Sequence, residues 1–439
     1  MTRDARMRGS AGTRSVIRDP KEPGRRVPRA GRGGPAGACA AGCTLLAAAL
    51  AVGCRGEPRS GGWAGRVDTL ATGTLVVRNP AAGVWDSASA WRLEEDLRIG
   101  AVEGTGPDVF GEITDIAVDA YGRIYVLDRQ AGGMRVFGPD GTYVRTIGRK
   151  GGGPGEFRDP IGLDWDPEGR LWVCDPGNAR YTAFDTAGAY AGLRRREIGG
   201  YTLPWPGGFD ERGRLYDATV TLSPRDRGHR RAVLVRMDTA GAPSDTVYLP
   251  EFAGRQFEVR DATRRSMIAV GVPFSGNLYF ALDRRGFVWF AWTADYRIHQ
   301  QALDSGDTVR IVERETTPVP VTDEEIEEAV SNLDWFVKQG GNVDRAQIPR
   351  VHPPIDAFGA DPQGYLWVLV TTRDRETRNR VFDVFDPAGR YLGAARSDVT
   401  IQRYPPPVFT DRHVYGVTAD TLGAVYVVRA RIVRPRPTD

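Results

Sequence analysis

The sequence predicts an all-β fold of six similar four-stranded units arranged in a closed ring. Three observations lead to this prediction: a short turn motif that recurs, strand-like alternation on both sides of it, and incomplete units at the two ends. One such unit cannot bury both of its faces, whereas a ring of units can. The predicted fold class is therefore a six-bladed β-propeller.

The recurring motif is Asp-x-x-Gly-x-aliphatic-aromatic. Its aspartate can accept hydrogen bonds from the backbone amides that follow, and its glycine suits a left-handed backbone conformation. Apolar residues before the turn and alternating residues after it predict two antiparallel strands. A third strand and a second turn follow in several units, which gives about four strands per unit. The six copies begin at Asp119, Asp166, Asp210, Asp283, Asp361 and Asp420.

The two ends of the chain are expected to share one blade. Only two strands remain from Asp420 to the C-terminus, so the sixth unit lacks its outer half. The segment Gly73–Trp85 and the following WRLEEDLRIG are typical of two strands. We therefore predict that N-terminal strands complete the last blade and close the ring. The propeller is predicted over residues 73–433, followed by a tail at 434–439.

One helical insertion is predicted between the fourth and fifth blades, over residues 313–352. Its helix is expected over Thr322–Asn342, where Thr322 and Glu325 have the spacing of a capping box. Two placements are open: a partial lid over the central channel, or a helix packed on the side of a blade. The predicted apolar stripe of this helix contains Ile326, Val330, Leu333 and Val337.

The N-terminus has the layout of a secretory signal, predicted over residues 1–53. An arginine-rich stretch leads into an uncharged run of apolar and small residues. The end of this run, Ala51–Cys54, resembles the bacterial lipoprotein cleavage box, which implies that Cys54 carries lipid. The alternative is an uncleaved anchor helix. In both cases the remainder is expected in the cell envelope, outside the cytoplasmic membrane, after a flexible linker at 54–72.

The net charge gives no reason to expect a nucleic-acid partner. The whole chain has a formal charge of +3, but residues 1–36 contain ten Arg or Lys against three Asp or Glu. The rest of the chain is therefore left at −4. A polyanion partner is not implied for that part, because the basic excess belongs to the predicted signal.

The repeat also indicates a family. The run Pro160–Gly188, with GGGPGEF just before it, resembles the NHL-repeat six-bladed propellers. The pattern is specific in the first two blades and looser in the others. Similar domains serve as extracytoplasmic sensor or binding modules, and relatives include metal-dependent lyases and lactonases. The resemblance therefore implies the fold but does not choose among these functions.

The candidate site is the face of the ring where the chain enters the inner strands. Polar and aromatic residues at or near these entrances predict a ligand-binding mouth. We find no HExxH, GxSxG, paired CxxC or dinucleotide motif, so no catalytic residue and no cofactor is predicted. A divalent metal remains an alternative, with His352, His413 and Glu112 as ligands. The mouth residues are Glu112, Asp159, Trp205, Arg350, His352, Asp356 and His413.

Three functions are compatible with this pattern. The preferred one is a membrane-tethered propeller that binds or senses a small molecule or an envelope protein and has no chemistry of its own. The second is a metal-dependent hydrolase or lyase, lactonase-like, that uses the channel mouth. The third is a scaffold in an envelope assembly that contacts its partners through the blade sides.

Overall fold

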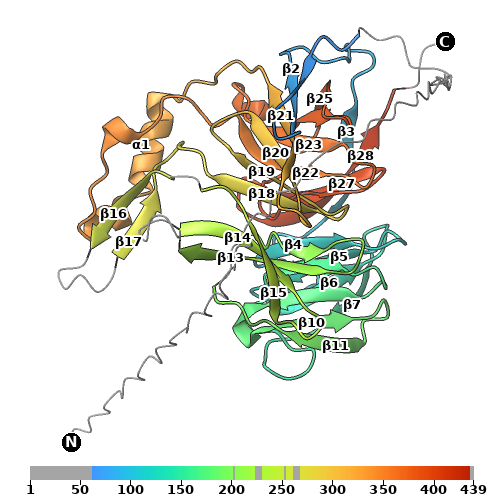
Figure 1. Ribbon diagram of the computed structural model, residues 1–439. Helices are drawn as coiled ribbons and strands as arrows, with labels where there is room; N and C mark the ends of the chain where they lie inside the picture. The colour runs from blue at the N-terminus through green and yellow to red at the C-terminus, as the bar shows by residue number, and fades with distance from the viewer. Residues whose placement is uncertain (1–61, 201–202, 223–229, 252–253, 261–266, 436–439) are drawn as a thin grey trace, which may run out of the picture. The chain divides into compact units, whose positions relative to one another are not determined.

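The computed structural model describes residues 62–200, 203–222, 230–251, 254–260 and 267–435. The predicted signal and Cys54 lie outside them. The described chain is mostly strand, in successive groups of four strands that we call sheets; two more strands extend the fourth group, and the fifth and last groups are joined into one eight-stranded sheet (Figure 1). Within it, no helix has both the length and the apolar character needed to cross a membrane. The first two sheets contain β4 (Ile113–Val118), β5 (Ile124–Asp128), β6 (Gly133–Phe137), β7 (Tyr143–Ile147), β8 (Gly162–Trp165), β9 (Leu171–Asp175), β10 (Arg180–Phe184) and β11 (Tyr190–Arg195).

Three further groups of four strands follow in chain order. Their buried apolar side chains form clusters shared between neighbouring sheets, as where Trp172 of the second sheet packs on Phe209 of the third, with ring centroids 5.6 Å apart. The strands are β12 (Gly208–Phe209), β13 (Leu215–Leu222), β14 (Arg230–Met237) and β15 (Pro243–Tyr248); β18 (Leu278–Asp283), β19 (Phe287–Trp292), β20 (Arg297–Ala302) and β21 (Thr308–Arg314); β22 (Ile355–Ala360), β23 (Leu366–Val370), β24 (Val381–Phe385) and β25 (Tyr391–Ser397).

The recurring turn forms as the sequence predicts. In the first copy, Asp119 Oδ1 accepts hydrogen bonds from the backbone amides two and four residues later, both at 2.9 Å. Gly122 has φ of 78°, a conformation that costs glycine little. In the second copy the other carboxylate oxygen of Asp166 also accepts from Trp172 Nε1 at 2.7 Å. This bond gives the motif's aromatic residue a role, because it ties the second strand to the turn.

The last sheet differs from the prediction in its strand count. Its order is β26 (Val408–Phe409), β27 (His413–Ala419), β28 (Val425–Val433) and β3 (Arg92–Ile99), and β3 runs antiparallel to β28. On its other side β3 pairs in parallel with the end of β25, which joins this sheet to the fifth. The turn at Asp420 thus lies between the second and third strands, whereas the other five copies lie between the first and second. The C-terminal chain supplies three strands here, so one N-terminal strand is present and not two.

The other predicted N-terminal strand belongs to a different sheet. A hairpin of β1 (Arg66–Thr69) and β2 (Leu75–Asn79) adds to the fourth sheet, where β2 runs parallel to β21. The segment Gly73–Trp85 therefore does not complete the last sheet. The predicted flexible linker at 54–72 is also corrected, because β1 lies inside it.

Asn79 at the end of β2 connects the fourth and fifth sheets. Its Nδ2 donates to the backbone carbonyls of Glu313 in β21 and Gly389 before β25, both at 3.0 Å. Its Oδ1 accepts from the backbone amide of Tyr391 in β25 at 2.7 Å. The side chain is 3% exposed, so these buried backbone groups have little access to water as a substitute partner.

We expect Asn79→Ala to lower the free energy of unfolding by about 1–3 kcal/mol, because it leaves buried backbone groups unpaired. Urea denaturation followed by circular dichroism measures this change. Asn332→Ala, at an exposed position after a helix, is the matched control and should stay within about 0.5 kcal/mol. Equal effects of the two substitutions would contradict the proposed role of Asn79.

The predicted helical insertion contains two helices. The capping box is confirmed: the backbone amide of Glu325 donates to Thr322 Oγ1 at 3.2 Å, and that of Thr322 donates to Glu325 Oε2 at 2.9 Å. The predicted continuous helix is interrupted, however. Phe336 is fully buried while Val337, expected in the apolar stripe, is 48% exposed. The helices are α1 (Asp323–Ser331) and α2 (Asp334–Lys338).

These helices pack on a hairpin that was not predicted from the sequence. The hairpin, β16 (Gln256–Arg260) and β17 (Met267–Gly271), lies beside α1 in Figure 1. Phe257 of the hairpin shares a buried cluster with Ile326 and Phe336 of the helices. The helices therefore have a partner that neither of the two predicted placements included. Three short 3₁₀ helices complete the described elements: Pro176–Asn178, Arg345–Gln347 and Arg375–Thr377.

Candidate functional site

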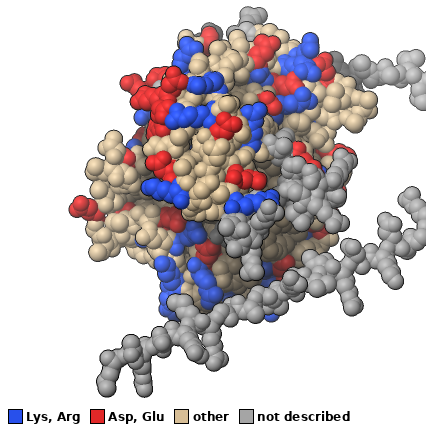
Figure 2. Space-filling view, turned by 90° about the vertical axis from the view of Figure 1, so that its left-hand side faces the viewer, with Lys and Arg blue, Asp and Glu red and all other residues tan. Residues whose placement is uncertain are grey.

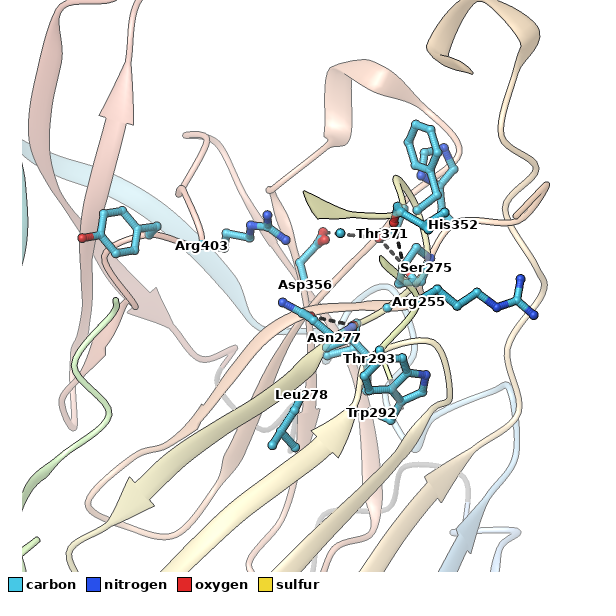
Figure 3. Close-up of a pocket in the computed structure, with 18 of the residues that line it drawn as sticks. Arg255, Ser275, Asn277, Leu278, Trp292, Thr293, His352, Asp356, Thr371 and Arg403 are labelled. Atoms are coloured by element: carbon cyan, nitrogen blue, oxygen red, sulfur yellow. Dashed lines mark hydrogen bonds between the residues drawn. The ribbon is translucent and has the colours of Figure 1, made fainter. Parts of the chain in front are cut away.

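A cavity of about 1110 Å³ lies where the fourth and fifth sheets meet the β16–β17 hairpin. We call it the mouth pocket. Asn277 directly precedes β18, and Asp356 is the second residue of β22. Thr293 and Thr371 directly follow the antiparallel partner strands β19 and β23. Each inner strand therefore begins beside the end of its neighbour, which brings these four polar side chains together (Figure 3).

The two threonines hold the entrances to the inner strands. Thr293 Oγ1 donates to the side-chain oxygen Oδ1 of Asn277 at 3.0 Å and accepts from the backbone amide of Asn277 at 2.9 Å. Thr371 Oγ1 donates to the Pro353 carbonyl at 2.7 Å and lies 3.3 Å from Asp356 Oδ2. These bonds fix the backbone from which the pocket side chains project.

Aspartates occupy the corresponding strand ends in the first two sheets. Asp128 accepts from the backbone amides of Gly111 and Glu112, and Asp175 accepts from those of Arg158 and Asp159. A signal for this role is present in the sequence, because both aspartates follow their repeat aspartate by nine positions. The turn motif ends before these positions, so neither aspartate was predicted to hold a strand entrance.

Asp356 and Arg403 carry opposite charges in the mouth pocket. In Figure 3 the guanidinium of Arg403 is turned toward the carboxylate of Asp356. Burial raises the pKa of Asp356, while the charges of Arg403, Arg378 and His352 oppose this rise. Arg403 is exposed and, in the part of the chain that the structure describes, has no hydrogen-bond or ion-pair partner.

A second charged group joins the pocket to the helical insertion. Glu325 of α1 accepts from Arg378 at 2.7 Å and contacts His352 Nε2 at 3.1 Å. Burial raises the pKa of Glu325, but hydrogen bonds from the Thr322 backbone, Arg378 and His352 outweigh it and lower this pKa to about 2. Phe274 and His352 also pack nearly perpendicular to each other, with ring centroids 5.1 Å apart.

Two of the seven predicted mouth residues, His352 and Asp356, line this pocket. Trp205 is buried and donates to Asp217 at 2.7 Å, so it has a packing role. Arg350 is exposed and forms an ion pair with Asp323 at 2.6 Å.

The other three predicted mouth residues have ion-pair partners elsewhere. Glu112 and Asp159 lie at the entrances of the first two sheets, and both bind Arg129, at 3.0 and 2.5 Å. His413 contacts Asp96 of β3 at 3.4 Å. His413 was predicted at the entrance to an inner strand, but it begins β27, the second strand of its sheet. The reason is that the Asp420 turn lies one strand later in this sheet than the other copies do in theirs.

The alternative metal ligands are not brought together either. His352 contacts Glu325, His413 contacts Asp96, and Glu112 contacts Arg129. Among the described residues, no three His, Cys, Asp or Glu side chains are grouped in a way that could hold a metal ion.

A second cavity, of about 550 Å³, follows the inner strands. Its lining includes two aspartates from neighbouring strands, Asp115 of β4 and Asp164 of β8. Burial raises the pKa of Asp115 to about 7. Burial also raises the pKa of Asp164, and the nearby Arg284 opposes this rise. Neither residue was predicted from the sequence to be functional, because each lies inside a strand-like run.

Comparison with known proteins agrees with this architecture. A family described as a 6-bladed beta-propeller matches residues 101–193. The mouse protein NHL repeat-containing protein 3 is 29% identical over 116 residues, which is 25% of this chain and 30% of that protein. The chain thus spans less than a third of this relative. These two matches support a β-propeller fold.

The solved structures that match this chain have low sequence identity to it. A protein from Bacteroides fragilis is 11% identical, with a TM-score of 0.47, and the match covers 82% of this chain and all of that one. Virginiamycin B lyase from Staphylococcus aureus is 10% identical, with a TM-score of 0.37, and the match covers 78% of this chain and all of that one. A gluconolactonase from Xanthomonas campestris is 13% identical, with a TM-score of 0.38, and the match covers 87% of this chain and all of that one.

Proposed function

We propose that the six groups of four strands are the blades of one closed propeller. The inner strands β4 and β8 contact each other, as do β8 and β12, β18 and β22, β22 and β26, and β26 and β4. Between the third and fourth sheets, the Glu211 amide donates to the Arg284 carbonyl at 2.8 Å. In this proposal β3 completes the last blade, and the mouth pocket opens on the face where ligands reach propellers.

We further propose that the propeller binds or senses a ligand at the mouth pocket and performs no chemistry of its own. The observation that carries this proposal is Arg403, a cation without a partner in the described chain, facing a half-buried carboxylate. Such pairs of convergent polar groups in a concave site are typical of binding pockets. A lipid anchor at Cys54 would hold the domain at the membrane, outside the cytoplasm.

We expect no nucleic-acid partner. Where described residues are visible in Figure 2, acidic and basic side chains are interspersed, and a single-sign surface of the kind that phosphate backbones require is not seen on this face. The ligand is therefore expected to be a small molecule or an envelope protein.

A thermal-shift screen of small molecules against the purified full chain tests the binding function. We expect at least one compound class to raise the melting temperature, since a ligand at 100 times its Kd stabilises by about 2.7 kcal/mol. Asn277→Trp fills the pocket and should abolish the shift. Gln339→Trp, at an exposed site on the insertion outside the pocket lining, should leave it unchanged. Failure of every class to bind would contradict the binding function.

Elemental analysis of the same protein tests the metal-dependent hydrolase or lyase. The binding function predicts no stoichiometric metal. A metal retained in stoichiometric amount, and lost in a His352→Ala/His413→Ala double variant, would overturn our preference in favour of the enzyme.

A further inference from the structure

The mouth pocket contains two opposite charges that do not pair with each other. Asp356 comes from the inner strand of the fifth sheet, and Arg403 comes from the connection between β25 and β26. Both line the pocket, and the guanidinium points toward the carboxylate (Figure 3). No ion pair forms between these two described residues, so a space separates them.

The neighbouring charges have partners within the protein. Arg378 and His352 both bind Glu325. Arg255 donates to the Gln347 carbonyl at 3.3 Å, and in Figure 3 its guanidinium points away from Asp356. Within the described lining, Arg403 is thus the cation without a hydrogen-bond or ion-pair partner, and Asp356 is the one carboxylate and has no ion-pair partner.

The carboxylate of Asp356 retains capacity to accept hydrogen bonds. Its neighbour at hydrogen-bonding distance is Thr371 Oγ1, at 3.3 Å. Thr371 Oγ1 lies closer to the Pro353 carbonyl oxygen, at 2.7 Å, so by distance this carbonyl is the better acceptor for its single hydroxyl proton. A half-buried carboxylate loses part of its hydration, and Asp356 has no well-placed protein donor to replace it. A cationic ligand group would supply charge-assisted hydrogen bonds in place of the lost water.

The surroundings suit a small organic ligand better than an inorganic ion. Leu278, Phe274 and Trp292 provide apolar lining, and Asn277 and Gln402 provide amides. The cavity of about 1110 Å³ has room for more than a single ion and lies slightly above the usual range for ligand pockets, about 300–1,000 Å³.

We propose that the mouth pocket binds a small zwitterion, of the size of an amino acid to a tripeptide, with its ammonium at Asp356 and its carboxylate at Arg403. This inference rests on the proposed binding function and adds the ligand class to it. One ligand then satisfies both unpaired charges, and two charge-assisted contacts at opposite ends fix its direction in the pocket.

Calorimetric titration of the full chain with alanine, dialanine and trialanine tests the proposal. At least one should bind, and its N-acetylated and C-amidated forms should bind at least about tenfold more weakly. Arg403→Gln should weaken the uncapped peptide about tenfold or more but leave the C-amide unchanged. Asp356→Asn should weaken the uncapped peptide and leave the N-acetyl form unchanged.

Matched controls separate charge recognition from loss of folding. Arg412→Gln and Asp411→Asn make the same changes at exposed sites outside the pocket and should leave binding unchanged. All four variants should keep the wild-type midpoint of urea unfolding. Equal binding of capped and uncapped peptides, or equal effects of pocket and control variants, would overturn the zwitterion proposal.

The outcome also separates this inference from the binding function. If none of the peptides binds, but another class from the screen binds and is blocked by Asn277→Trp, the zwitterion proposal is overturned and the binding function stands. If neither the peptides nor any screened class binds, both are overturned.

Discussion

Asp383→Ala is expected to lower the free energy of unfolding by about 3–5 kcal/mol, the largest single effect that we predict. Asp383 lies in β24 and is 1% exposed. Its carboxylate accepts from the hydroxyls of Tyr296 at 2.6 Å and Tyr391 at 2.8 Å, and forms an ion pair with Arg314 at 3.0 Å. Removing the carboxylate leaves a largely buried guanidinium and two buried hydroxyls without their acceptor.

Denaturation by guanidinium chloride measures this loss, with Asp245→Ala as the control. Asp245 forms an ion pair with Arg236 at 3.2 Å, but its side chain is 52% exposed. Exposed pairs are worth little, so the control should change stability by less than about 1 kcal/mol. Tyr296→Phe removes one of the three donors to Asp383, so its loss of stability should lie between those of Asp383→Ala and Asp245→Ala. Similar values for Asp383→Ala and Asp245→Ala would contradict a structural role for the buried cluster.

The cluster around Asp383 shows how neighbouring sheets are joined. Arg314 ends β21 of the fourth sheet and Tyr296 directly precedes β20 of that sheet, while Asp383 and Tyr391 belong to the fifth. Asn79 connects the same two sheets from the N-terminal hairpin. The chain thus places several buried polar contacts at one junction, where the inserted helices also leave the fourth sheet.

The repeated turns could be predicted from the sequence because their chemistry is local. Asp119 and Gly122 are three positions apart, and the hydrogen bonds of the aspartate reach residues two and four positions later. Local rules of this kind fix a turn whatever surrounds it. The capping box of Thr322 and Glu325 was predictable for the same reason.

Contacts between distant segments could not be predicted in this way. The pairing of β2 with β21, and the hairpin on which the helices pack, depend on segments far apart in the chain. The stretched spacing from Asp210 to Asp283 was the available signal for that hairpin. One error had a local cause: Asp420 begins a typical repeat motif, but it lies one strand later in its sheet than the other copies.

The candidate site was likewise predictable only where the signal is local in the sequence. His352 and Asp356 were identified because they lie near a predicted strand entrance. Arg403 was not identified, because nothing in its own segment distinguishes it from the many arginines of the chain. Its position opposite Asp356 arises only when the fifth and last sheets are placed side by side.

The second large effect concerns Asp115, which lies in the cavity along the inner strands. Its carboxylate accepts from the backbone amides of Leu163 at 2.7 Å and Ile116 at 2.8 Å. Burial raises its pKa from 3.8 to about 7; the two hydrogen bonds oppose this rise, and the charge of Asp164 adds to it. In the folded state the proton is therefore held far more tightly than in the unfolded chain.

Asp115→Asn is expected to change how stability depends on pH. Between about pH 4 and pH 7 the folded wild type binds a proton that the unfolded chain has lost, so this group's stabilising contribution falls as pH rises through that range. The contribution is complete below about pH 4 and gone above about pH 7. An asparagine does not titrate, so the free energy of unfolding of the variant should rise relative to that of the wild type as the pH increases.

Urea denaturation at a series of pH values from 4 to 8 measures the difference between variant and wild type. Each pKa unit corresponds to about 1.4 kcal/mol, so the difference should grow by as much as about 4 kcal/mol between the two ends of the range. Asp245→Asn, at the exposed site used above, should run parallel to the wild type. Parallel curves for Asp115→Asn and wild type would show that Asp115 is ionised in the folded protein throughout this range, and that the cavity along the inner strands is open enough to solvate a charge.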